Sequence, residues 1–223
     1  MALKSARAVG SVVLATPPDG DALLWAPAAG RALLAWSIAA LVAAPEVAGV
    51  RLVVAAQRLD AARALVAMHG WAHVLPIAPD ATGKPPSPTR DGAWTYVLVH
   101  DAARPLLTSA LVSRVVTAAA TTGAAVAVEP VSETIKRVER GIVVETLSRA
   151  ELAQLATPLV LRADLFDALV RDTADWSALP ATLVARALAS GIAVQTVTID
   201  GESFAVTSVA DLAVAEALLA TRA

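Results

Sequence analysis

The chain has 223 residues, of which 57% are hydrophobic and only 4% aromatic, with a formal net charge of −2 and no cysteine. This length and hydrophobic content suit a folded domain and exclude a disordered chain. The near-neutral charge argues against a basic surface for nucleic acid or anionic lipid, and the lack of cysteine excludes disulfides and thiolate chemistry. The longest apolar run, Ala32–Pro45, is too short to span a bilayer. We therefore expect a cytoplasmic protein with no nucleic-acid or membrane partner.

In the first half of the chain, short runs of β-forming residues alternate with segments of helical periodicity. The expected strands are Ser11–Ala15, Val50–Ala55, His73–Ile77, Tyr96–His100 and Ala124–Val128, and the expected helices are Arg31–Ala43, Leu59–His69 and Ser109–Thr121. This alternation predicts an α/β fold in which helices enclose a mixed, mostly parallel sheet. Residues 78–94 contain four prolines, which predicts an irregular insert.

The second half of the chain begins with a different pattern. Val131–Leu147 alternates polar and apolar residues on both sides of a turn at Glu139–Gly141, which predicts a protruding β-hairpin. After it we expect helices over 162–169, 180–190 and 209–220, and a strand over 192–199. The chain shows no linker or repeat, so we expect one domain over 1–223 with a hairpin arm at about 131–148.

The most informative stretch is 97–105, where an apolar strand runs into the sequence His-Asp-Ala-Ala-Arg-Pro. In α/β proteins ligands bind at the carboxyl ends of the strands, because the loops there diverge over the sheet edge. Asp101 would accept hydrogen bonds or bind a metal at that edge, and Arg104 could bind a phosphate or carboxylate with two N–H groups. The alternative at these two residues is an intramolecular ion pair. His100 is expected to orient the loop after its strand.

This stretch, together with further motifs in the same order and spacing, resembles the 2-C-methyl-D-erythritol 4-phosphate cytidylyltransferase family. The other motifs are Glu133-Thr134-Ile135-Lys136-Arg137, Arg149 ahead of Ala156-Thr157-Pro158, and Val206-Thr207 followed by Asp211-Leu212-Ala213. The resemblance spans about Val12 to Leu219. It implies a Rossmann-like nucleotidyltransferase fold whose hairpin arm clasps a second subunit.

The resemblance also implies a sugar-phosphate site that is completed across a dimer. Asp101, Arg104 and Thr157 would come from the domain, while Thr134 and Arg149 would come from the partner's arm. The two arginines can bind phosphate oxygens and the two threonine hydroxyls can donate to them, while Asp101 accepts from the polyol. Taken alone, however, the arm residues could equally form a solvated hairpin with ordinary surface charge.

The nucleotide side departs from the family pattern. The family's glycine-rich loop, which approaches the triphosphate and is followed by Arg and Pro-Lys, corresponds here to Thr16–Leu23, with two prolines and the acids Asp19 and Asp21. The family lysines fall at Leu23 and Ala205. We therefore expect a catalytically impaired relative, with no catalytic residue assigned and the nucleotide-binding residues unknown.

Several alternatives remain open from the sequence. An active nucleotidyltransferase could hold CTP and Mg²⁺ through a remodelled loop, with Lys84 or Arg90 replacing the lost cations. A partner role is a second possibility, in which the chain forms a homodimer or a heterodimer with a catalytic paralogue and still binds a sugar phosphate. A third is a structural remnant that binds no small molecule.

Overall fold

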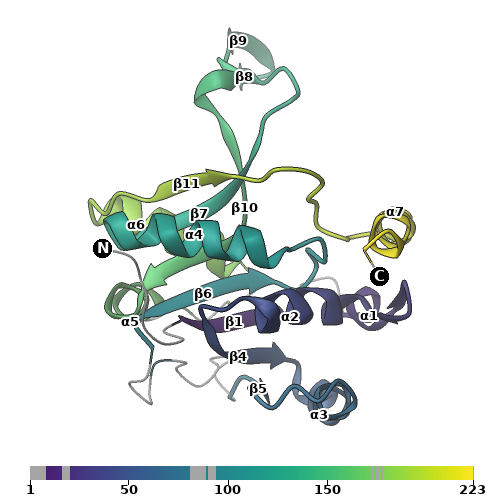
Figure 1. Ribbon diagram of the computed structural model, residues 1–223. Coiled ribbons are helices and arrows are strands. Elements are labelled where there is room, and N and C mark those ends of the chain that lie inside the picture. The colour runs from purple at the N-terminus through teal and green to yellow at the C-terminus, as the bar shows by residue number, and fades with distance from the viewer. Residues whose placement is uncertain are drawn as a thin grey trace.

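The computed structural model describes residues 9–16, 21–80, 89, 94–171, 173, 176 and 178–222. Its main sheet has seven strands in the order β11-β7-β10-β6-β1-β4-β5 (Figure 1). The strands are β1 (Val9–Ala15), β4 (Val47–Val54), β5 (Val74–Ile77), β6 (Tyr96–Asp101), β7 (Ala124–Pro130), β10 (Ala153–Arg162) and β11 (Gln195–Thr198). All run parallel except β10, which pairs antiparallel with β6 and β7. The predicted mixed, mostly parallel sheet is confirmed.

Helices cover both faces of this sheet (Figure 1). Successive side chains of a strand point to opposite faces. Val13 of β1 belongs to one hydrophobic cluster, with α2 (Leu33–Ala43) and α4 (Ser109–Thr122), whereas Val12 belongs to the other, with α5 (Ala163–Val170) and α6 (Leu179–Ala189). The remaining helices are α1 (Ala22–Trp25), α3 (Leu59–Met68), α7 (Val209–Ala220), η1 (Ala56–Arg58) and η2 (Arg149–Glu151). Among the described residues, no helix combines the length and apolar character needed to cross a membrane.

The parallel register brings the carboxyl ends of the central strands to one edge of the sheet. Leu14 of β1 lies opposite Asp101 of β6, and Ala15 lies opposite Val54 of β4. The loops that follow β1, β4, β6 and β7 therefore leave the sheet on the same side. We refer to this side as the carboxyl edge.

Strand β10 was not expected from the sequence, because Pro158 lies within it and proline cannot donate to a β-ladder. The pairing of β10 with β7 shifts register between Leu155 and Leu159, so the proline lies where the ladder is interrupted. Two further differences are small: Arg31–Ala32 (β3) pairs with Pro27–Ala28 (β2) instead of starting a helix, and β11 is shorter than the expected strand. Most of the 78–94 insert lies outside the described residues.

The predicted hairpin is confirmed. β8 (Lys136–Glu139) pairs antiparallel with β9 (Ile142–Thr146), and the pair projects away from the main sheet (Figure 1). Arg140 and Gly141 take positive φ values of 50° and 81° at the turn, a conformation that suits a tight hairpin. We call residues 131–148 the arm; that the rest of 1–223 is one domain stays a prediction.

Candidate functional site

Asp101 stands at the end of β6 on the carboxyl edge. Its Oδ1 accepts a hydrogen bond from the backbone N–H of Ala103 at 2.9 Å. Burial raises the pKa of the Asp101 carboxyl above its ordinary value, although the Ala103 N–H and the nearby Arg104 charge oppose that rise. Asp101 therefore presents a partly buried carboxyl group at the carboxyl edge, and its role as an acceptor for a ligand hydroxyl stays a prediction.

Thr157 is tied to β6 by a buried polar network. Its Oγ1 accepts from the Asp101 N–H at 3.3 Å and lies 3.0 Å from Nδ1 of His100. The other ring nitrogen of His100, Nε2, lies 3.2 Å from the carbonyl oxygen of Arg104, to which Ser37 Oγ also donates. His100 is fully buried, and that burial lowers its pKa to about 3, so the imidazole is neutral at pH 7.

The direction of the hydrogen bonds in this network follows from which atoms can donate and which can only accept. A carbonyl oxygen can only accept, so His100 Nε2 carries the ring proton and donates to Arg104. Nδ1 is then an acceptor, and the Thr157 hydroxyl donates to it. The Thr157 hydroxyl thus already donates its hydrogen bond to His100, and it cannot also donate to a phosphate without breaking that bond. His100 orients the loop after its strand, as expected.

Arg104 is already paired within the chain. Its Nη1 donates to Glu129 Oε1 at 2.6 Å and lies 3.4 Å from Ser203 Oγ. The Arg104 and Glu129 side chains are only 13% and 20% exposed, so water screens this pair less than it screens a surface pair. The sequence left open an ion pair between Arg104 and Asp101; the ion pair that forms uses Glu129, at the end of β7, instead.

The arm residues lie apart from these groups. Thr134 is exposed just before β8, and Arg149 in η2 donates from Nη1 to the Ser132 carbonyl oxygen at 3.1 Å. Thr134 lies on the arm two residues before β8, and Arg149 directly follows the arm. Within one chain, the structure therefore brings together Asp101, Arg104 and Thr157, and leaves Thr134 on the arm and Arg149 directly after it.

On the nucleotide side, Asp21 is not an unopposed negative charge. Arg58, the last residue of η1 after β4, donates to both Asp21 oxygens, from Nε at 2.9 Å and from Nη2 at 3.0 Å. Trp25 Nε1 also donates to Asp21 at 3.2 Å, and the Arg58 guanidinium lies over the Trp25 ring. The cation that neutralises Asp21 thus comes from outside the loop Thr16–Leu23. Asp19, Lys84 and Arg90 lie outside the described residues.

Ala205, at a position where the resemblance expects lysine, lies next to the loop after β6. The N–H of the following residue, Val206, donates to the Ala103 carbonyl oxygen at 2.8 Å. The alanine methyl, which packs against the hydrophobic core, supplies neither the charge nor the hydrogen-bond donor of a lysine. In the described part of the chain, no three His, Asp or Glu side chains gather as a metal site. Asp101 nevertheless fits as one carboxylate ligand for a Mg²⁺ that arrives on nucleotide phosphates.

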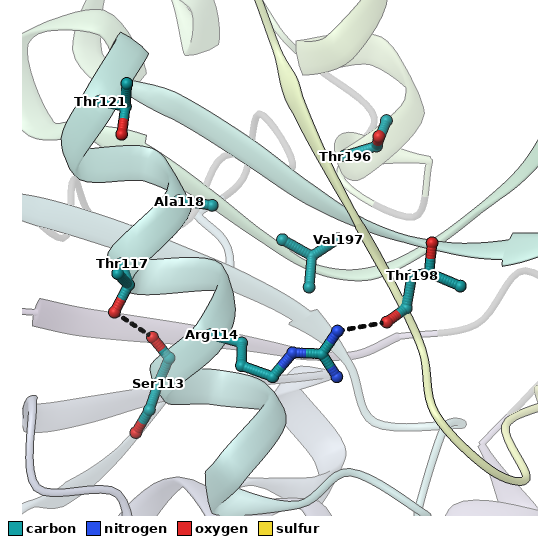
Figure 2. A pocket seen from close by; sticks show the side chains of 8 residues that line it. All are labelled: Ser113, Arg114, Thr117, Ala118, Thr121, Thr196, Val197 and Thr198. Atoms are coloured by element: carbon teal, nitrogen blue, oxygen red, sulfur yellow. Dashed lines mark hydrogen bonds between the residues drawn. The ribbon is translucent and has the colours of Figure 1, made fainter.

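The structure also has a groove of about 590 Å³ away from these residues, between α4 and β11. Threonines 117, 121, 196 and 198 line it, and Arg114 reaches across it (Figure 2). Arg114 Nη2 donates to the Thr198 carbonyl oxygen at 2.9 Å, and Nη1 pairs with Asp200. Arg114 therefore holds β11 against α4, and among the described residues none of the predicted site residues lines the groove.

The family model for 2-C-methyl-D-erythritol 4-phosphate cytidylyltransferase matches residues 18–221. The chain belongs to this family. A curated cytidylyltransferase from Dehalococcoides mccartyi is 32% identical over 167 residues, which is 70% of this chain and 73% of that protein. The crystal structure of the Thermus thermophilus cytidylyltransferase matches with a TM-score of 0.67 at 27% identity, over 94% of this chain and 97% of that one.

A synthase structure from Anaerococcus prevotii shares the fold of this cytidylyltransferase-family chain, with a TM-score of 0.77 at 17% identity over 96% of each chain. The Rossmann-like nucleotidyltransferase fold predicted from the resemblance is thereby confirmed. Sequence reasoning missed two residues of the carboxyl edge, Arg58 and Glu129. Each follows or ends a predicted strand, so the rule that singled out Asp101 could have found them.

Proposed function

We propose that this family member keeps part of the sugar-phosphate pocket and the arm but does not carry out ordinary cytidylyl transfer. The observation that carries the proposal is the state of the cations at the carboxyl edge. Arg58 and Arg104 are each paired with a carboxylate of the same chain, Asp21 and Glu129. The two positions at which the resemblance expects lysine are Leu23 and Ala205.

The reaction of the family makes these losses costly. A phosphate oxygen of the acceptor attacks the α-phosphorus of CTP, the bond to the β-phosphate oxygen breaks, and pyrophosphate leaves with the negative charge. Loss of one preorganised group that stabilises such charge costs on the order of 10²–10³ in rate. Because such losses are not additive, we do not multiply them. Two missing lysines are nevertheless enough to remove ordinary turnover.

An active enzyme is the second candidate, and Arg58 is the observation that favours it. Arg58 places a guanidinium on the nucleotide side of the carboxyl edge, held over Trp25. If the triphosphate displaces Asp21, this guanidinium could contact phosphate oxygens, with Mg²⁺ arriving on the nucleotide. Under this alternative, Arg58→Ala abolishes a turnover that the unaltered chain shows with CTP.

The arm supports a further part of the proposal, that the chain acts as a dimer. Val138, Ile142, Val143 and Val144 on the arm are each at least 50% exposed, and a cluster of exposed apolar side chains is typical of a contact surface. Through this arm, Thr134 and Arg149 would reach the pocket of a second copy or of a catalytic paralogue. A paralogue is distinguished by CTP-dependent turnover that rises when this chain is added to it.

The experiment that tests the proposal is calorimetric titration of the full chain with methylerythritol phosphate, and separately with CTP and Mg²⁺. We expect binding of the sugar phosphate and none of CTP. Binding of CTP together with release of pyrophosphate would favour the active enzyme instead. Binding of neither ligand would leave the fold and arm as the only functional parts.

A further inference from the structure

We propose that Glu129 is an internal competitor for the phosphate of the ligand, and that it sets how tightly this chain binds phosphorylated sugars. This inference rests on the proposed function, since it assumes that Arg104 faces the sugar-phosphate pocket. It adds a residue that no motif of the family resemblance includes. In physical terms, the Glu129 carboxylate already binds the Arg104 guanidinium, which a ligand phosphate would otherwise bind.

The position of Glu129 in the sheet makes this competition direct. Glu129 lies near the end of β7, opposite Gln154 of β10, while Arg104 follows β6 on the other side of β10. The ion pair therefore crosses β10 at the carboxyl edge, a span of about 10 Å between β7 and β6. Thr157 also lies on β10, and its hydroxyl oxygen accepts a hydrogen bond from the Asp101 N–H. Glu129 thus reaches into the group of residues predicted to hold the sugar phosphate.

The contact is strong enough to matter for a ligand. The Nη1–Oε1 distance of 2.6 Å joins two largely covered side chains, so the pair is a charge-assisted hydrogen bond in poorly solvated surroundings. A phosphate dianion that approaches Arg104 either displaces Glu129 or sits beside its negative charge. Both outcomes weaken binding, whereas a neutral polyol meets neither penalty. Glu129 consequently discriminates against the phosphorylated form of a ligand.

The test removes the charge and keeps the shape. Wild-type protein and Glu129→Gln are titrated calorimetrically with methylerythritol phosphate, with inorganic phosphate and with unphosphorylated methylerythritol. We expect Glu129→Gln to bind the two phosphate ligands at least about tenfold more tightly, while binding of the unphosphorylated polyol changes little. In Glu129→Gln combined with Arg104→Ala the gain disappears.

The matched control is Asp164→Asn, which also removes one carboxylate from an arginine pair. Arg162 is the last residue of the antiparallel strand β10 and Asp164 follows it in α5, so this pair lies at the opposite edge of the sheet. This variant has the same net charge as Glu129→Gln, so a gain of phosphate affinity in both would be a general charge effect and would overturn the proposal. Should Glu129→Gln unfold, Glu129→Ala gives the same comparison without a polar side chain at 129.

The outcomes separate this inference from the proposed function. If wild type binds methylerythritol phosphate and Glu129→Gln binds it no more tightly, Glu129 is a structural partner of Arg104 and the inference alone is wrong. If neither the wild type nor either Glu129 variant binds any phosphate ligand, the proposed sugar-phosphate site is wrong and the inference is lost with it. Tighter phosphate binding in Glu129→Gln but not in Asp164→Asn supports both.

Discussion

At the scale of single residues, the buried polar side chains near the candidate site form hydrogen bonds with one another. His100, Thr157 and Ser37 are buried, and they join β6, β10 and α2 through hydrogen bonds to one another and to the Arg104 carbonyl oxygen. Because a buried group without a partner is costly, each member depends on the others. The network therefore fixes the loop that carries Asp101 and Arg104, without providing a free hydroxyl for catalysis.

The depressed pKa of His100 gives this network a pH signature. In the folded protein the imidazole has a pKa of about 3, compared with its ordinary 6.5. Between these values the unfolded chain binds a proton that the folded chain does not. The free energy of unfolding should therefore fall as the pH drops below about 6.5, with a slope approaching about 1.4 kcal/mol per pH unit.

Urea unfolding between pH 7.5 and 5.5 measures this slope; Asp101, whose pKa is raised by burial, contributes a trend of the opposite sign. His100→Gln should reduce the slope, whereas His73→Gln, at an exposed position, should retain it. An unchanged slope in His100→Gln would show that the imidazole is not held neutral by the fold.

At the scale of elements, the pattern of apolar residues was enough to predict the parallel strands and most helices, because burial sets their periodicity. It was not enough for β10, where Pro158 contradicts strand propensity and only the register shift against β7 accommodates it. It also failed for the carboxyl edge, since the partners of Arg104 and Asp21 depend on the order of strands. The motifs identified Asp101 and Arg104, but no pattern indicated that Glu129 would pair across β10.

Helix α4 follows the site loop directly, and its first turn is capped by the last loop residue. Thr108 Oγ1 accepts from the Leu111 N–H at 3.2 Å. Thr108→Ala should lower the free energy of unfolding by about 1 kcal/mol, because that donor loses its protein partner. Thr108→Ser keeps the acceptor and should cost much less. Equal losses in the two variants, measured by urea unfolding, would assign the effect to the threonine methyl instead of the cap.

At the scale of the whole molecule, the arm is the part that does not pack against the hydrophobic core. Its strands are exposed along their full length, and Ile142 and Val143 are 68% and 59% exposed. An isolated two-stranded hairpin is only marginally stable in water. The proposed contact with a second subunit would cover these apolar side chains.

Charged substitutions on the arm test this account. The double variant Ile142→Asp with Val143→Asp should convert a dimer to a monomer in light scattering, because it buries like charges at the contact. Its free energy of unfolding as a monomer should change little, since these side chains touch little of their own chain. Met68→Asp on α3, where the methionine is 72% exposed, should leave the oligomeric state unchanged. A dimer that persists in the double variant would exclude the arm as the contact.

The arm also separates two kinds of chemistry along its length. Its apolar side chains lie on β8 and β9 toward the turn, whereas Thr134 and Arg149 lie at the two points where the arm leaves and rejoins the domain, with Arg149 tied to Ser132. Substitutions near the turn would therefore change the proposed subunit contact without altering Thr134 or Arg149. Substitutions at Thr134 or Arg149 would change the proposed pocket without altering the apolar contact. If the proposed dimer forms, its subunit contact and its pocket chemistry could therefore be altered separately by substitution.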